Sequence, residues 1–188
     1  KFAYPINVSF NSAIRNAAAQ CGDGKTFSRK SPLTSEVLIR LLIGAEGGSL
    51  DKIAHAAGLE VTASAISQRR AQIDPAVFRS VFDSFNADCV DDLLFRDYRL
   101  LAVDGTTVNL PRHPAALSFV CHDGIKGVNQ LHLTPLYDLL ARTFMDAVIQ
   151  PEPKKDEIGA PVMMLERGYF PRKTLIIADR APISSFFG

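Results

Sequence analysis

Two aspartates that each follow a short apolar run are the residues of this sequence best suited to metal-dependent chemistry. Asp104 follows residues 100–103, and Asp179 follows residues 175–178. Continuous apolar runs of this length are typical of strands buried on both faces of an α/β sheet. Ligands bind at the carboxyl ends of such parallel strands. We therefore expect the two carboxylates to converge there and to hold Mg²⁺ or Mn²⁺, which prefer oxygen ligands.

Each aspartate also has a structural interpretation, because Asp-Gly is a common turn pair and a carboxylate after a strand often caps a turn. A phosphatase interpretation can be excluded. Residues 103–106 resemble the DxDGT signature of haloacid-dehalogenase phosphatases, but Ala102 occupies the position of their nucleophile. The metal site and the pair of turn caps remain the two alternatives for Asp104 and Asp179.

The segments between the two aspartates predict the elements that must position them. Residues 130–138 and 143–150 alternate in polarity as strands do, and residues 139–142 leave room only for a tight reversal, so we expect a β-hairpin. Residues 155–167 favour a helix that ends at Gly168. The order strand, hairpin, helix, strand is the first half of a ribonuclease-H-like fold, with the helix crossing over to return a parallel strand. We place this partial α/β domain at residues 99–188.

The N-terminal region, residues 1–98, is expected to be helical. Apolar spacing predicts helices over residues 33–45, 50–57 and 62–70, the last two separated by Gly58 in the outline of a helix-turn-helix. The last of these helices carries polar side chains suited to phosphates and base edges, and the candidate DNA contacts are Ser64, Gln68, Arg69 and Arg70. A solvated structural hairpin is the alternative. The apolar stripe over residues 77–85 is predicted to be core, and the acidic residues at 88–97 lack the rigid spacing that metal ligands need.

Composition excludes several classes of protein. The chain has 188 residues, of which 47% are hydrophobic and 22% are charged, with a formal net charge of +1, as expected for one or two globular domains. No apolar run approaches the roughly 20 residues of a membrane span, so we expect no membrane partner. The three cysteines are too widely spaced for a zinc site or a disulfide framework, and the Cys121-His122 pair is not a tetrahedral ligand set. The cytoplasm is the expected compartment.

The sequence resembles the DDE transposases of the IS4 family of bacterial insertion sequences. The resemblance rests on residues 101–107, 134–138, 156–157 and 177–180, and more weakly on residues 31–34, 66–70 and 74–78. It implies that Asp104 and Asp179 are the first two members of a catalytic Asp-Asp-Glu triad that uses Mg²⁺ or Mn²⁺. The implied partner is double-stranded DNA at the terminal repeats, which Arg180 would also contact. A DNA-associated protein of the bacterial cytoplasm, and an assembly as a homodimer, are further expectations.

The third carboxylate of that triad has no counterpart in the expected place. In the family this glutamate lies on a helix well downstream of the second aspartate, whereas only nine residues follow Asp179, and Glu157 and Glu166 precede it. We therefore expect the chain to be truncated, frameshifted or a fragment, and to be inactive in phosphodiester cleavage and strand transfer. The rival functions are a non-catalytic DNA-binding protein that uses the hairpin at residues 50–73, and a metal-free structural domain.

Overall fold

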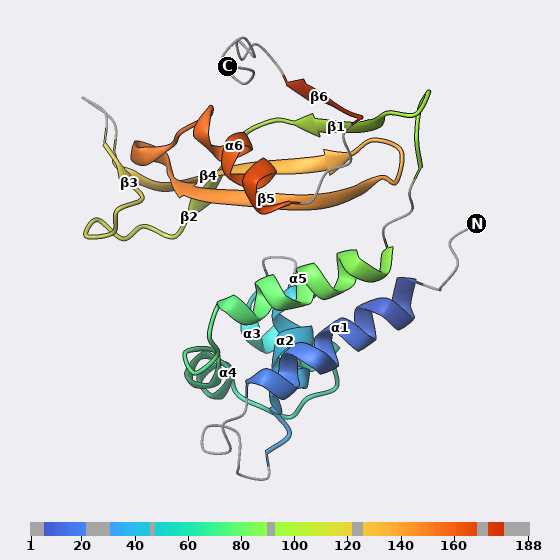
Figure 1. The fold of residues 1–188 in the computed structure, drawn as a ribbon. Helices are drawn as coiled ribbons and strands as arrows, with labels where there is room; N and C mark the ends of the chain where they lie inside the picture. The colour runs from blue at the N-terminus through green and yellow to red at the C-terminus, as the bar shows by residue number, and fades with distance from the viewer. Residues whose placement is uncertain are drawn as a thin grey trace. The chain divides into compact units, whose positions relative to one another are not determined.

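The computed structural model describes residues 6–21, 31–45, 48–89, 93–121, 126–168 and 173–178. These residues form six α-helices, one 3₁₀ helix and a six-stranded mixed sheet, so the protein belongs to the mixed α/β class. The chain divides into two compact units, Lys1–Cys89 and Val90–Gly188, whereas the sequence placed the boundary between residues 98 and 99. Figure 1 shows helices alone in the first unit, and the sheet with helix α6 in the second. Among the described helices, none has the length and apolar character needed to cross a membrane.

Three helices of the first unit begin at polar capping residues. The hydroxyls of Thr34, Ser49 and Thr62 each accept a hydrogen bond from the backbone N–H three residues further on, which satisfies one of the free donors of a helix start. The three predicted helices are confirmed with slightly shorter bounds, and a helix that precedes them had not been expected. In chain order the helices are α1 (Ile6–Gln20), α2 (Ser35–Ile43), α3 (Leu50–Ala56), α4 (Ala63–Arg70) and α5 (Ala76–Cys89).

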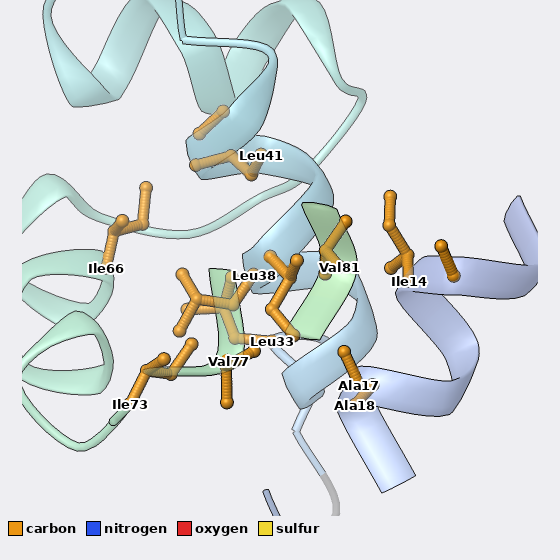
Figure 2. Packing of buried hydrophobic residues seen from close by; sticks show 13 residues of the cluster. Ile14, Ala17, Ala18, Leu33, Leu38, Leu41, Ile66, Ile73, Val77 and Val81 are labelled. Carbon is orange, nitrogen blue, oxygen red and sulfur yellow. The ribbon is translucent and has the colours of Figure 1, made fainter. Parts of the chain in front are cut away.

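One apolar core holds the first unit together. Figure 2 shows Ile14 of α1, Leu38 of α2, Ile66 of α4 and Val81 of α5 pointing into the same cluster. All four side chains are buried. Val81 belongs to the apolar stripe predicted to be core, and that prediction is confirmed for four of its five residues, the exception being the half-buried Phe82, which is not part of this cluster. Because Ile66 is an anchor of this core, the inward face of α4 is committed to packing and only its polar face remains exposed.

The second unit is built on one long central strand. Its strands are β1 (Arg99–Val103), β2 (Thr106–Leu110), β3 (Phe119–Val120), β4 (Val128–Asp138), β5 (Thr143–Pro151) and β6 (Thr174–Ala178). Strand β4 pairs with β2 and then β1 along one edge, and with β3 and then β5 along the other. Strand β6 is parallel to β1 and lies beyond it, which gives the order β5–β4–β1–β6 through this part of the sheet.

The predicted hairpin is the antiparallel pair of β4 and β5. Its turn is fixed by Asp138, whose Oδ1 atom accepts hydrogen bonds from the backbone N–H groups of Leu140 and Ala141, each at 2.9 Å. Arg142 closes the turn with a φ of 56°, in the left-handed region that non-glycine residues seldom adopt. The segment of four residues between the strands therefore reverses the chain as expected.

Helix α6 (Gly159–Arg167) covers one face of the sheet and is shorter than the predicted helix over 155–167. The chain first forms the 3₁₀ helix η1 (Glu152–Lys154), and Asp156 then caps the start of α6 by accepting from the N–H groups of Ile158 and Gly159. Pro161 is tolerated because it lies in the first turn, where an N–H has no partner within the helix. The residues that α6 and the sheet bury together are Leu101, Val103, Leu136, Val148, Ala160 and Met164.

The expectation that both apolar runs would be buried on two faces is wrong for β6. Leu175 and Ile177 are 51% and 49% exposed, and alternate residues of the strand are half-buried. Within the described residues β6 has one neighbouring strand, and α6 covers only the opposite face of the sheet. An apolar run identifies a strand, but the elements that pack on its two faces are decided elsewhere in the chain.

Candidate functional site

Asp104 lies immediately after β1 and its side chain is exposed. Its Oδ1 atom accepts a hydrogen bond from the backbone N–H of Gly105 at 2.7 Å. This contact is local, to the next residue of the chain, and is compatible with the structural interpretation of Asp104. A carboxylate has about four acceptor positions, so one such bond leaves capacity on the exposed group for a further ligand.

The two apolar runs form neighbouring parallel strands, as the sequence predicted. Five residue pairs join them in register, beginning with Arg99 opposite Thr174 and ending with Val103 opposite Ala178. The residues that follow this last pair in the chain are Asp104 and Asp179. Asp179 and Arg180 lie outside the described residues, so the convergence of the two carboxylates remains a prediction.

Two buried acidic side chains of the second unit form ion pairs. Asp138 is fully buried, and its Oδ2 atom is 2.8 Å from Nε of Arg99. Asp146 is also buried, with Oδ2 3.2 Å from the guanidinium of Arg167. Across the described residues no group of three or more His, Cys, Asp or Glu side chains is arranged to hold a metal ion. Of the acidic segment at 88–97, Asp97 is exposed, and the side chains at positions 88, 91 and 92 lie outside the described part.

A buried histidine, to which the sequence analysis assigned no function, packs against the turn that follows Asp104. His132 of β4 is 5% exposed, and neither of its ring nitrogens has a hydrogen-bond partner among the described residues. A Cβ atom at Gly105 would lie 2.6 Å from Nε2 of this ring. Only glycine therefore lets the backbone of the turn rest directly on the imidazole.

Glu152 of η1 lies on the other side of the same imidazole. Its Oε2 atom is 3.5 Å from Nδ1 of His132 and accepts a hydrogen bond from the Thr107 hydroxyl at 3.3 Å, while Oε1 is 3.1 Å from Nζ of Lys155. Partial desolvation opposes ionisation of Glu152, but the hydrogen bond and charge of Lys155, the Thr107 hydroxyl and the His132 ring together hold its pKa below the ordinary value. The sequence feature connected with this cluster is a histidine among the alternate, buried residues of β4, but that pattern does not identify the groups against which it packs.

The candidate DNA-contacting residues lie on α4, and the structure does not distinguish their two interpretations. Ser64, Gln68 and Arg70 are exposed, whereas Arg69 is half-buried and donates to Oε1 of Gln72 at 3.4 Å. Residues 57–62 connect α3 to α4, and Gly58 makes the turn with a φ of 68°.

A second contact joins the two helices. Oδ1 of Asp51, in the first turn of α3, accepts from the backbone N–H of Ala63 at 3.0 Å. This bond joins the start of α4 to the start of α3. The exposed polar face of α4 therefore belongs to a pair of helices that are fixed to each other at this point.

Comparison with known proteins gives no relative. No protein-family model matches the chain, and no curated protein and no solved structure is similar to it at a significant level.

Proposed function

We propose that this chain is part of an IS4-type DNA transposase and that residues 99–188 supply the first half of a ribonuclease-H-like catalytic domain. The sheet order β5–β4–β1–β6, with β1 antiparallel to β4 and parallel to β6, supports this proposal. Helix α6 lies between β5 and β6 in the chain, as the crossover of such a fold requires. The observation that carries the proposal is the in-register pairing that ends at Val103 and Ala178, directly before the two aspartates.

In this function Asp104 and Asp179 hold Mg²⁺ or Mn²⁺ at the carboxyl end of β1 and β6. The donor set fits these ions because it consists of carboxylate oxygens and because Asp104 is exposed. If held there by these carboxylates, a divalent ion would supply positive charge for the attacking and leaving oxygens of a phosphodiester. The polar face of α4, together with Arg180, is proposed to contact the terminal repeats of the DNA.

A metal-binding measurement tests the role of Asp104. Titration of the protein with Mn²⁺, followed by the electron paramagnetic resonance signal of the free ion, is expected to reveal weak binding that falls by about tenfold or more in Asp104→Asn, since the variant loses a charged ligand of the site. Asp97→Asn is the matched control, because Asp97 is an exposed carboxylate on a loop of the same unit. Equal Mn²⁺ affinity in the wild type and in Asp104→Asn would show that Asp104 is not a metal ligand.

The second candidate function is DNA binding without catalysis, and the exposed polar face of α4 favours it. Replacing Arg69 and Arg70 together by alanine is expected to weaken binding to duplex DNA and to reduce the slope of log K against log salt by up to about 2, since each phosphate contact contributes roughly 0.9. The measurement is fluorescence anisotropy of a labelled duplex over a salt series.

Arg79→Ala is the control for this experiment, because Arg79 lies on α5 and forms an ion pair with Asp83 at 2.8 Å. An unchanged affinity and salt slope in the double variant would reduce the helix pair to a structural role. DNA binding that depends on Arg69 and Arg70, combined with no Mn²⁺ binding, would favour the non-catalytic function over the transposase.

A further inference from the structure

We propose that His132 and Glu152 are positioning residues that fix the turn carrying Asp104. This inference rests on the proposed function in one respect, the role of Asp104 as a metal ligand. The contacts themselves connect three elements, because His132 lies on β4, Glu152 on η1 and the Asp104–Gly105 turn between β1 and β2. None of these residues except Asp104 belongs to the proposed metal site.

The contacts form a continuous chain that ends at the Asp104 carboxylate. Lys155 pairs with Glu152, and Glu152 lies against the ring of His132 at 3.5 Å. The far edge of that ring supports Gly105, where even a Cβ atom would come within 2.6 Å. The N–H of Gly105 in turn binds Oδ1 of Asp104 at 2.7 Å. A displacement of the imidazole therefore reaches Asp104 through a single backbone residue.

Glu152 also ties the start of β2 to η1, because its Oε2 atom accepts from the hydroxyl of Thr107. The ring of His132 therefore contacts the turn at Gly105, and the bond from Thr107 to Glu152 fixes the first residues of β2, which follow the turn. Since a catalytic group must be held to a fraction of an ångström, such surrounding contacts decide whether an exposed carboxylate keeps one position. The buried His132, which lacks a hydrogen-bond partner among the described residues, costs stability. An apolar side chain of similar size would avoid this cost, so packing alone does not account for a histidine at this position.

The test is the amide resonance of Gly105 in ¹H–¹⁵N spectra of the 188-residue chain. This proton reports its bond to the Asp104 carboxylate directly. In His132→Ala we expect the resonance to lose the downfield shift of a carboxylate-bound amide, and its exchange with solvent to become about tenfold faster. His55→Ala is the matched control, because His55 is exposed on α3 in the other unit.

Two further variants test the same contacts, and the first of them, Glu152→Gln, does not require His132→Ala to fold. Glu152→Gln preserves the side-chain size and the bond from Thr107, but removes the charge that faces Lys155 and His132, so a smaller change of the Gly105 resonance in the same direction is expected. Gly105→Ala should lower the free energy of unfolding less in the His132→Ala background than in the wild type, because the ring that its methyl group would contact is absent.

An unchanged Gly105 resonance in folded His132→Ala, or in Glu152→Gln where the first variant is unfolded, would overturn the positioning role. Additive effects of Gly105→Ala and His132→Ala would do the same. Addition of Mn²⁺ separates this inference from the proposed function: broadening of the Gly105 resonance by Mn²⁺ supports a metal site at Asp104. A changed resonance in His132→Ala without broadening in the wild type keeps the positioning role and rejects the metal site.

Discussion

Replacing Met164 by alanine is expected to lower the free energy of unfolding of the second unit by about 2–5 kcal/mol. Met164 is completely buried between α6 and the sheet, where it contacts the cluster formed by Leu101, Leu136 and Val148. Truncation removes apolar contacts and leaves a cavity that the short helix can fill only by moving. Urea unfolding followed by circular dichroism measures the change.

The adjacent residue provides the matched control. Met163 is 47% exposed on the same helix, so Met163→Ala removes the same atoms from a position with little packing and is expected to remain close to the wild type. Equal destabilisation by the two substitutions would mean that α6 does not dock through Met164.

Asp138→Ala is expected to destabilise the second unit by about 3–5 kcal/mol, the range found when one partner of a buried ion pair is removed. The substitution leaves the guanidinium of Arg99 buried without its carboxylate, and it also removes the acceptor for two N–H groups of the β4–β5 turn. Thermal and urea denaturation of the variant would give the change in stability.

A double variant separates the buried charge from the turn. Arg99→Met combined with Asp138→Leu removes both charges, and should be less destabilising than Asp138→Ala alone, because no uncompensated charge remains in the interior. A double variant at least as unstable as the single one would assign the main role of Asp138 to the turn.

The elements predicted from the sequence are those with a strong local pattern. The hairpin of β4 and β5 follows from alternating polarity, and the strands β1 and β6 follow from apolar runs. Strand β2 could not be predicted in this way, since all five of its residues are exposed and it forms only because the long β4 offers an edge for pairing. The exposure of β6 was missed for the same reason, because burial depends on partners that the run itself does not encode.

The same distinction, between features with a local sequence pattern and features that depend on distant partners, applies to the candidate site. Asp104 could be identified from its place after an apolar run, and the polar residues of α4 from their types alone. The support beneath Asp104 could not, because His132, Glu152 and Gly105 are far apart in the chain and are joined by strand register and by the fold-back of η1. A histidine within an alternating strand carries no local mark of the backbone against which it packs.

The parallel pairing of β1 with β6 has a consequence for the order in which the second unit folds. The hairpin closes a loop of four residues, whereas joining Arg99 to Thr174 closes one of about 75, which costs roughly 2–3 kcal/mol more loop entropy. The hairpin is therefore expected to form early and the β1–β6 pairing late. Pulse-labelling hydrogen exchange would detect this as slow protection of β6 amides, and early protection there would contradict it. The strand ends that precede Asp104 and Asp179 would then meet only in the last stage of folding.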